Sequence, residues 1–273
     1  MNRKVVLVTG ASAGIGKAIA KQLLKDGLVV YVAARRLEKM HDLEKLGAIA
    51  LKMDVTSEEE MGRAINRITT AHDGVDVLVN NAGYASYGSV EETTVEDARR
   101  QFEVNLFGLA RLTQLVIPAM RHKGAGTIIN MSSMGGKIYT PLGAWYHATK
   151  HALEGWSDCL RLELAQFGIE VVIIEPGGIE SEFSEVMMSP MLERSGDGPY
   201  AAWAKSLQKA SMDMNEHGRV SPPSVIADLV SEAVKANKPK TRYVAGYMAK
   251  PALFLRWLLP DRWFDSIIRR ASL

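Results

Sequence analysis

The stretch KVVLVTGASAGIGKAIAKQLLKDG, from Lys4 to Gly27, contains a strand, a glycine-rich turn and a helix. The apolar, β-branched run in Lys4–Gly10 predicts a buried strand, and Gly14–Gly27 predicts a helix that ends at glycine. The turn TGASAGIG (Thr9–Gly16) has glycines that suit a tight bend and close approach of the backbone to a phosphate. The helix that follows presents N–H groups and the positive end of its dipole. The stretch therefore predicts a cradle for a pyrophosphate.

The same alternation of strand and helix continues along the chain. Short apolar runs predict further strands at Leu28–Arg35, Ala48–Val55, Val75–Gly83, Gly126–Ser133, Ile169–Gly178 and Thr241–Gly246. Helical patterns lie between them, and the two longest cover Thr94–Gly124 and Ala144–Gly168. Strands that are apolar throughout need helices on both faces, and right-handed crossovers make the sheet doubly wound. The sequence predicts one α/β domain over residues 1–273, with a Rossmann-type, mostly parallel sheet.

Composition narrows the function classes. The 273 residues are 47% hydrophobic and 23% charged, as in soluble globular proteins, and the net charge of +2 gives no reason to expect nucleic acid. Cys159 is the single cysteine, which excludes an internal disulfide and fits a reducing, cytoplasmic location. The apolar run near the start is too short for a signal peptide, and no run is long enough to predict a membrane-spanning helix. The histidines lack HExxH spacing, and we predict no metal site.

Several short motifs follow the glycine turn in a fixed order. They are NNAG (Asn80–Gly83), FEVNLFG around Asn105, NMSS ending at Ser133, YHATK (Tyr146–Lys150) and PGG (Pro176–Gly178). With the turn's G-x-x-x-G-x-G spacing, they resemble the short-chain dehydrogenase/reductase family over about Met1–Phe183. The resemblance is to members of the 17-beta-hydroxysteroid and retinol dehydrogenase type. It implies an oxidoreductase that transfers hydride between a nicotinamide dinucleotide and a carbonyl or secondary alcohol.

The YHATK motif suggests the catalytic group. Tyr146 and Lys150 are four residues apart, so they share a helix face. The charges of Lys150 and of an oxidised nicotinamide together would stabilise a phenolate, whose phenol has an ordinary pKa of about 10. Tyr146 could then act as general acid or base. The resemblance implies that Ser133, 13 residues before Tyr146, orients the substrate oxygen, with Ser132 as the alternative. It also gives Asn105 a relay role, holding a water that passes protons to Lys150. A buried amide bonded to backbone is the simpler interpretation of Asn105, and both can hold.

Two arginines favour NADP over NAD. An acidic residue after the second strand would bind the ribose hydroxyls of NAD, but this chain has Arg35 and Arg36, which suit a 2′-phosphate. They could instead be a solvated helix start, and Ala13 stands where NADP enzymes of the family often carry a basic residue. Tyr146 and Lys150 would also contact the cofactor. The other expected contacts are Gly10, Ser12, Gly14, Ile15, Gly16, Arg35, Arg36, Asp54, Val55, Asn81, Ala82, Gly83, Pro176, Gly177, Ile179 and Ser181.

Residues 180–219 are rich in Met, Ser, Gly and Pro, and we interpret them as an irregular, mobile lid over the site. A disordered surface loop is the alternative. The lid has large apolar residues, namely Phe183, Met187, Met188, Met191, Leu192 and Trp203. Such flexible side chains predict a bulky hydrophobic alcohol or ketone, such as a steroid, a retinoid or a lipid.

The tail, residues 249–273, is amphipathic, mixing Trp257 and Trp263 with arginines, and Pro260 divides it. We interpret it as packing on the domain or at a subunit interface, with membrane-surface contact as the alternative. The family resemblance implies a homodimer or homotetramer. Two other functions stay open: a cofactor-sensing protein without turnover, and lipid-surface attachment as the main role.

Overall fold

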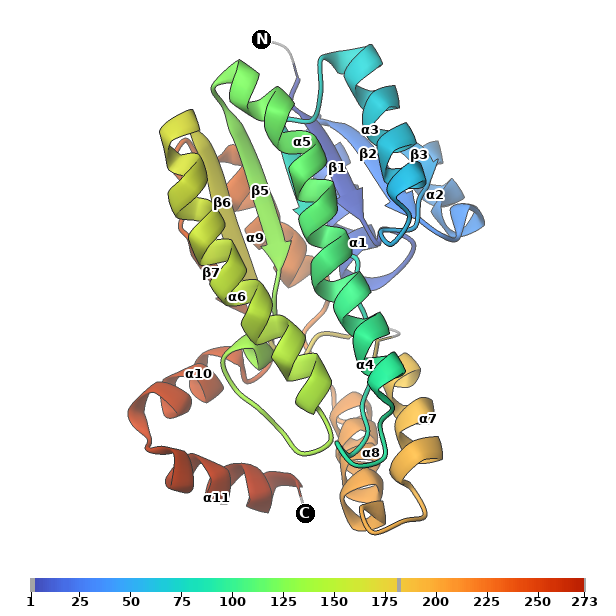
Figure 1. Cartoon of the computed structure of the whole chain (residues 1–273), viewed down its shortest axis with the longest axis vertical. Helices are drawn as coiled ribbons and strands as arrows, with labels where there is room; N and C mark the ends of the chain where they lie inside the picture. The colour runs from blue at the N-terminus through green and yellow to red at the C-terminus, as the bar shows by residue number, and fades with distance from the viewer. Residues whose placement is uncertain (1–2, 181–182, 273) are drawn as a thin grey trace.

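A seven-stranded parallel sheet forms the centre of the computed structural model, which describes residues 3–180 and 183–272 (Figure 1). The strands are β1 Val5–Thr9, β2 Val29–Ala34, β3 Ile49–Lys52, β4 Val77–Asn80, β5 Gly126–Met131, β6 Ile169–Pro176 and β7 Arg242–Ala245. Their order is β3-β2-β1-β4-β5-β6-β7. The order reverses between β1 and β4, and ligands bind beyond the carboxyl ends of strands at such a switch point. The predicted doubly wound α/β fold is confirmed.

Helices cover both faces of the sheet (Figure 1). One face carries α1 Gly14–Lys25, η1 Leu37–Met40, α2 His41–Lys45 and α9 Ser224–Lys235, and the other carries α3 Glu58–His72, α5 Leu109–Lys123 and α6 Ala144–Leu164. An apolar core lies on each face of the sheet, and alternate residues of β1 pack into one core or the other. Val6 and Val8 pack under α1, whereas Val5 and Leu7 pack on the α3 side. Because both faces are buried, the strand is apolar from Val5 to Val8, and only Thr9 at its carboxyl end is polar.

The helix predicted over Thr94–Gly124 has a π-helical turn at its centre. It comprises α4 Val95–Phe102, the π turn η2 Glu103–Gly108, and α5. Thr94 caps α4 by accepting a hydrogen bond from the N–H of Asp97, and Gly124 ends α5 with a φ of 65°. Pro118 lies inside α5 without ending it. Asn105 lies in the π turn, a feature that is frequent at functional sites.

Residues 180–219 are largely helical, which corrects the prediction of an irregular segment. They form α7 Phe183–Ser195 and α8 Ala201–Glu216, which lie beyond the carboxyl ends of the strands (Figure 1). Residues that favour helix are frequent in both: methionine, leucine, glutamate and arginine in α7, and alanine, lysine and methionine in α8. Of the glycines that suggested a loop, Gly196 and Gly198 lie in the turn between the helices and Gly218 lies in the turn after α8. Pro190 is accommodated within α7.

The tail forms two helices, α10 Ala249–Leu258 and α11 Asp261–Ser272, divided at Pro260 as predicted. Phe264 of α11 is 1% exposed and its ring meets Tyr139 edge-on at 5.5 Å. The tail therefore packs on the domain, while Trp257 and Trp263 remain exposed. Among the residues that the structure describes, no helix is both long and apolar enough to cross a membrane.

Candidate active site

The turn between β1 and α1 depends on its glycines. Gly10 and Gly14 have φ values of 66° and 52°, in the left-handed region that favours glycine. A Cβ added at Gly16 would lie 2.4 Å from the carbonyl oxygen of Gly10. The N-cap residue of α1 makes no side-chain hydrogen bond, and the first turn has no acidic residue. A helix N-terminus of this kind suits a phosphate group, and the predicted contacts Ser12 and Ile15 lie in the same turn.

The loop after β4 is tied to this turn. Asn81 Nδ2 donates hydrogen bonds to the carbonyl oxygens of Thr9 at 3.0 Å and Gly10 at 3.3 Å. In return, Thr9 Oγ1 accepts from the N–H groups of Asn81 and Ala82, each at 3.0 Å. These bonds join the two loops at the switch point into one surface. Thr9 was not singled out from sequence, because its role depends on a strand that comes 70 residues later.

The residues expected near the adenosine half lie at the ends of β2 and β3. Arg35 and Arg36 are exposed. Tyr84 lies in the loop after β4; burial raises its pKa, and the positive charge of Arg35 is among the charges that lower it. Asp54 Oδ1 accepts hydrogen bonds from Thr56 N–H at 2.9 Å and Thr56 Oγ1 at 2.8 Å. Asp54 therefore stabilises the turn that begins after β3 by binding Thr56.

Beyond β6 the backbone is held by two neighbouring segments. The Gly177 N–H donates to the Ala245 carbonyl oxygen at 2.8 Å, after Pro176 ends the strand. A Cβ on Gly177 would lie 2.3 Å from the Tyr247 carbonyl oxygen, so only glycine fits. Ile179 pairs with Ser221 in an isolated bridge. Ser181, the last predicted cofactor contact, lies outside the described residues.

Tyr146, Ser133 and Lys150 meet at the carboxyl ends of β5 and β6. Burial raises the pKa of Tyr146, and a hydrogen bond with the Ser133 hydroxyl lowers it. Ser133 Oγ also accepts from the Gly135 N–H at 3.0 Å, which orients it. Lys150 Nζ lies 6.0 Å from the Tyr146 ring centroid and donates to the Met131 carbonyl oxygen at 2.7 Å. Burial lowers the pKa of Lys150 to about 8, and the Glu154 carboxylate opposes that shift.

The pKa of Tyr146 is raised in the chain alone, whereas the sequence-based expectation of a stabilised phenolate includes the charge of a bound oxidised nicotinamide. The reason is that desolvation exceeds the other effects in the chain alone. A phenol that keeps its proton can act as a hydrogen-bond and proton donor.

Asn105 lies beside the same group, on the π turn. Its Oδ1 accepts from the Tyr84 N–H at 3.1 Å, and its Nδ2 donates to the Tyr84 carbonyl at 2.9 Å and to Thr149 Oγ1 at 3.2 Å. The simpler interpretation of Asn105, an amide bonded to backbone, is therefore correct. A Cβ on Gly83 would lie 3.2 Å from Asn105 Oδ1 and 3.9 Å from Lys150 Nζ, so both side chains flank the same glycine.

The side chains of Ser132 and Ser133 contact different residues. The Ser132 hydroxyl is buried and has no hydrogen-bond partner within residues 3–180 and 183–272. It faces Gly136, where an added Cβ would lie 2.8 Å from its oxygen. Ser133 alone meets Tyr146, which favours the primary sequence prediction over its alternative.

Apolar side chains from α7 and α8 enclose Tyr146. It belongs to a buried cluster with Ala85, Tyr87, Leu142, Met191 and Ala204, and Met187, Met188, Leu192, Tyr200, Trp203 and Leu207 pack against that cluster. The Tyr87 and Tyr146 ring centroids are 6.0 Å apart. Four of the large apolar residues predicted to line the lid pack against this cluster, and a fifth, Met191, belongs to it. The sixth, Phe183, has a side chain that the structure does not describe.

A family model for short chain dehydrogenases matches residues 4–190, most of the chain. The protein belongs to the short-chain dehydrogenase/reductase family. Its members are oxidoreductases that act on carbonyl or alcohol groups with NAD or NADP.

Three similar proteins are named as reductases of different substrates. An NADPH-dependent 3-dehydrocapnine reductase from Ornithobacterium rhinotracheale is 35% identical over 281 residues, covering 97% of this chain and 95% of its own. A 3-ketodihydrosphingosine reductase from Bacteroides thetaiotaomicron is 36% identical over 186 residues, covering 68% and 67%. The solved structure of an actinorhodin polyketide ketoreductase variant with NADPH has a TM-score of 0.75 at 33% identity, covering 89% and 95%.

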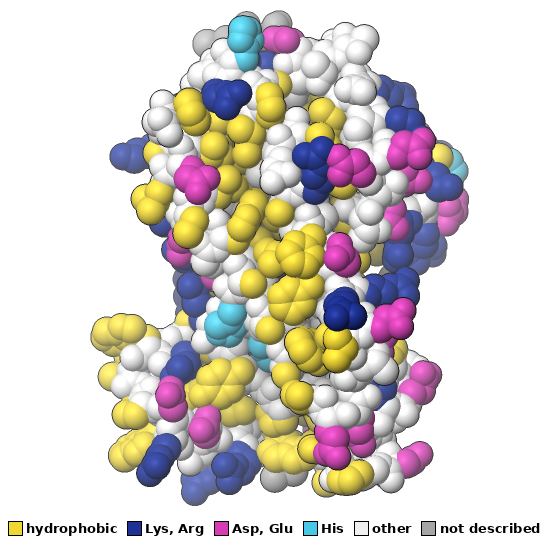
Figure 2. Space-filling view, in the orientation of Figure 1, with side chains coloured by type: hydrophobic (Ala, Val, Ile, Leu, Met, Phe, Trp, Pro, Cys, Tyr) yellow, Lys and Arg dark blue, Asp and Glu magenta, His cyan; other side chains and the backbone are white. Residues whose placement is uncertain are grey.

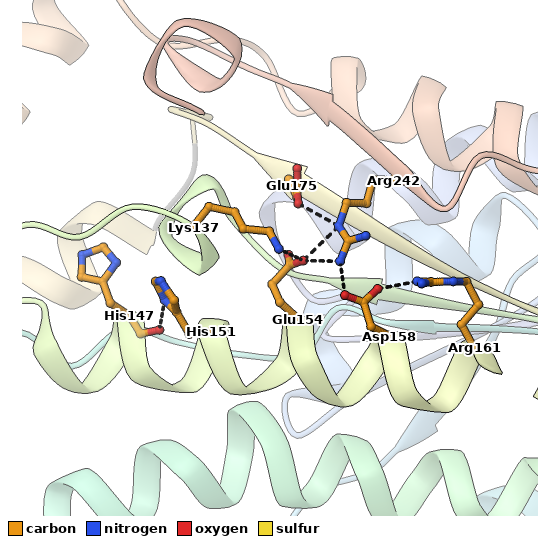
Figure 3. Close-up of polar contacts among 8 residues, drawn as sticks. All are labelled: Lys137, His147, His151, Glu154, Asp158, Arg161, Glu175 and Arg242. Carbon is orange, nitrogen blue, oxygen red and sulfur yellow. Dashed lines mark hydrogen bonds and ion pairs between the residues drawn. The ribbon is translucent and has the colours of Figure 1, made fainter. Parts of the chain in front are cut away.

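The sequence analysis missed a group of charged residues beyond Lys150 (Figure 3). Glu154 is four residues after Lys150, so it shares the same face of α6, and this spacing was the available signal. Its partners Lys137 and Arg242 lie on other elements, with ion pairs of 3.1 and 3.0 Å. Arg242 is 88 residues further along the chain, and no local pattern could connect the two.

Proposed function

We propose that this short-chain dehydrogenase/reductase uses NADP(H) to interconvert a carbonyl and a secondary alcohol on a hydrophobic substrate. The observation that carries the proposal is the meeting of Tyr146, Ser133 and Lys150 beside the glycine turn. A proton donor, a hydroxyl and a buried cation at one point suit reaction at a C–O centre.

Each side chain has a distinct part in the proposed reaction. When bound, the dinucleotide supplies or accepts the hydride. In reduction, Tyr146 gives its proton to the carbonyl oxygen, and Ser133 donates a hydrogen bond that fixes this oxygen. Lys150 supports the resulting phenolate by its charge and holds the nicotinamide ribose. Asn105 positions the proton supply beside Lys150. In oxidation of an alcohol, the same groups act in reverse.

NADP is the proposed cofactor because of Arg35 and Arg36. Arginine pairs well with a 2′-phosphate, and two of the three relatives above are named with NADPH. The adenine would lie by Asp54 and Val55, and the pyrophosphate at Gly10–Gly16. The second candidate is an NAD-dependent alcohol dehydrogenase of the same family, favoured by the absence of a basic residue at Ala13.

The apolar cluster on Tyr146 supports a hydrophobic substrate. Methionine side chains adapt to bulky apolar groups, and three of the methionines from α7 belong to or pack on this cluster. Two relatives are named as reductases of 3-dehydrocapnine and 3-ketodihydrosphingosine. We propose a ketone on a long or bulky apolar skeleton as the substrate class, with 180–219 acting as its lid.

The proposed assembly is a homodimer or homotetramer in the cytoplasm. Figure 2 shows hydrophobic side chains along the middle of the face formed by α4, α5 and α6. Phe107 and Val95 are 53% and 58% exposed there, and they line a hollow of about 210 Å³ with Trp145. A second copy would cover this face. The exposed Trp257 and Trp263 of the tail suit a further subunit contact, and a membrane surface is the alternative partner.

The decisive test compares Tyr146→Phe with Tyr87→Phe. Both remove a buried hydroxyl from the same cluster, but only the first removes the proposed proton donor. We expect Tyr146→Phe to lose at least about 10²-fold in turnover of apolar ketones, the range for general acid catalysis, while NADPH binding is retained. Tyr87→Phe should keep most of its turnover.

Full turnover by Tyr146→Phe would refute the mechanism. Tight NADPH binding without turnover of any ketone or alcohol by the wild type would instead favour a cofactor-sensing protein.

A further inference from the structure

A buried group of charges lies one turn of α6 beyond Lys150 (Figure 3). Glu154 is at its centre, and its side chain is 4% exposed. Glu154 Oε2 lies 3.1 Å from Lys137 Nζ, and it accepts hydrogen bonds from Arg242 Nη2 at 3.0 Å and Nε at 3.2 Å. Arg242 also pairs with Asp158 at 2.7 Å. Two cations from separate elements therefore share one carboxylate.

A second buried carboxyl group completes the arrangement. Glu175 of β6 lies 3.3 Å from Arg242 Nε and is 3% exposed. Burial and the neighbouring Glu154 carboxylate raise the pKa of Glu175 to about 7. The pair therefore holds a proton in slightly acidic solution, while Glu154 keeps two cations as partners. A buried ion group is weak evidence for stability, since apolar replacements are often as stable, so its position beside Lys150 calls for another explanation.

Lys150 is the group that most needs a nearby negative charge. It is 8% exposed, and its ammonium group donates a hydrogen bond to a neutral carbonyl, that of Met131. The titratable or charged groups on this stretch of α6, or facing it, come from α6, the segment after η3 (Met134–Gly136), β6 and β7. They are Tyr146, His147, His151, Glu154, Asp158, Lys137, Glu175 and Arg242.

Within this set, Glu154 is the group that favours a charged Lys150. Burial lowers the pKa of His147, whose Nδ1 contacts the Gly135 carbonyl oxygen, so His147 is neutral. Lys137 and Arg242 carry the same sign as Lys150, and both are paired with the Glu154 carboxylate. Glu154 is the carboxylate that opposes the desolvation of Lys150.

We propose that Glu154 is the positioning residue that keeps Lys150 charged in the enclosed site, and that Lys137 and Arg242 limit how much of its field reaches Lys150. The inference rests on the proposed function, in which Lys150 must be a cation to support Tyr146. Under this inference Glu154 extends the pH range in which the enzyme is active, and it acts through Lys150 without touching the substrate.

The test is a pH titration of Lys150 in protein carrying ¹³Cε-labelled lysine, with the resonance assigned by its loss in Lys150→Arg. In Glu154→Gln we expect the Lys150 pKa to fall by roughly one unit or more, the size of effect of a close opposite charge. In Lys137→Met it should rise, because a like charge is removed. Glu163→Gln, on the exposed face of α6, removes the same charge as Glu154→Gln and should shift nothing.

Activity gives the second measurement, as the pH profile of NADPH-dependent reduction of 2-decanone. Charged Lys150 is lost as pH rises through its pKa, so a lower pKa moves the alkaline limb to lower pH. Glu154→Gln should therefore move that limb down and Lys137→Met should move it up. A structural role alone would not give shifts of opposite sign.

Two outcomes separate the inference from the proposed function. An unchanged Lys150 titration in a folded Glu154→Gln variant overturns the inference, even if the enzyme reduces ketones. Opposite shifts in the titration support it even if no ketone is reduced, in which case the proposed function fails. Lys137 is 39% exposed, so Lys137→Met keeps the test available if Glu154→Gln does not fold. In that event, no rise of the Lys150 pKa in Lys137→Met would count against the inference.

Discussion

Replacing Arg35 by alanine should weaken NADPH binding and leave NADH binding almost unchanged. Arg35 is exposed after β2 and makes no hydrogen bond or ion pair with any residue in the described ranges, so its removal costs the fold little. A charge-assisted hydrogen bond contributes about 1.5–3 kcal/mol when sheltered, and an exposed one less. We therefore expect a loss of about 1–2 kcal/mol, which is roughly a 5- to 30-fold increase in the Kd for NADPH.

The assay is nicotinamide fluorescence, titrated with NADPH and NADH at fixed low salt, because salt screens exposed charges. Lys45→Ala is the matched control, since it removes an exposed cation from the far end of α2. It should change neither Kd by more than about twofold, as expected of a distant surface charge. An equal loss for both cofactors in Arg35→Ala, or no loss for either, would refute the assignment of Arg35 to the 2′-phosphate.

Three further predictions address the substrate oxygen, the tail and the assembly. Ser133→Ala should lower kcat about 10²-fold because a donor to the reacting oxygen is lost, whereas Ser132→Ala should have little effect in the same steady-state assay. Phe264→Ala should lower the free energy of unfolding by about 3–5 kcal/mol in denaturant titration, since it empties a fully buried site; a loss below about 1 kcal/mol would contradict that packing. Phe107→Glu should shift the protein to a monomer in size-exclusion chromatography with light scattering, whereas Leu46→Glu, also on an exposed apolar residue, should not.

The sequence was sufficient for the fold because local pattern and tertiary structure agree along the sheet. The β1 residues from Val5 to Val8 are apolar since both faces are buried, and Gly10 and Gly14 of the turn have the left-handed conformations that suit glycine. The sequence was insufficient where structure depends on distant partners. Glu154 joins a network of ion pairs only because the fold places Arg242 of β7 beside it. The irregular structure expected for residues 180–219 was wrong because their glycines lie in the turns that follow α7 and α8 and not inside these helices.

The electrostatics of Tyr146 could not be predicted from the spacing of Tyr146 and Lys150 alone. That spacing places a cation near the phenol, which lowers its pKa, but it does not reveal how far α7 and α8 exclude water. In the structure burial is the larger effect on Tyr146, and the same burial lowers the pKa of Lys150 to about 8. Enclosure therefore keeps the phenol protonated and weakens the cation that would ionise it. Both effects suit a tyrosine that begins as a proton donor, which is the role that the proposed reduction requires of it.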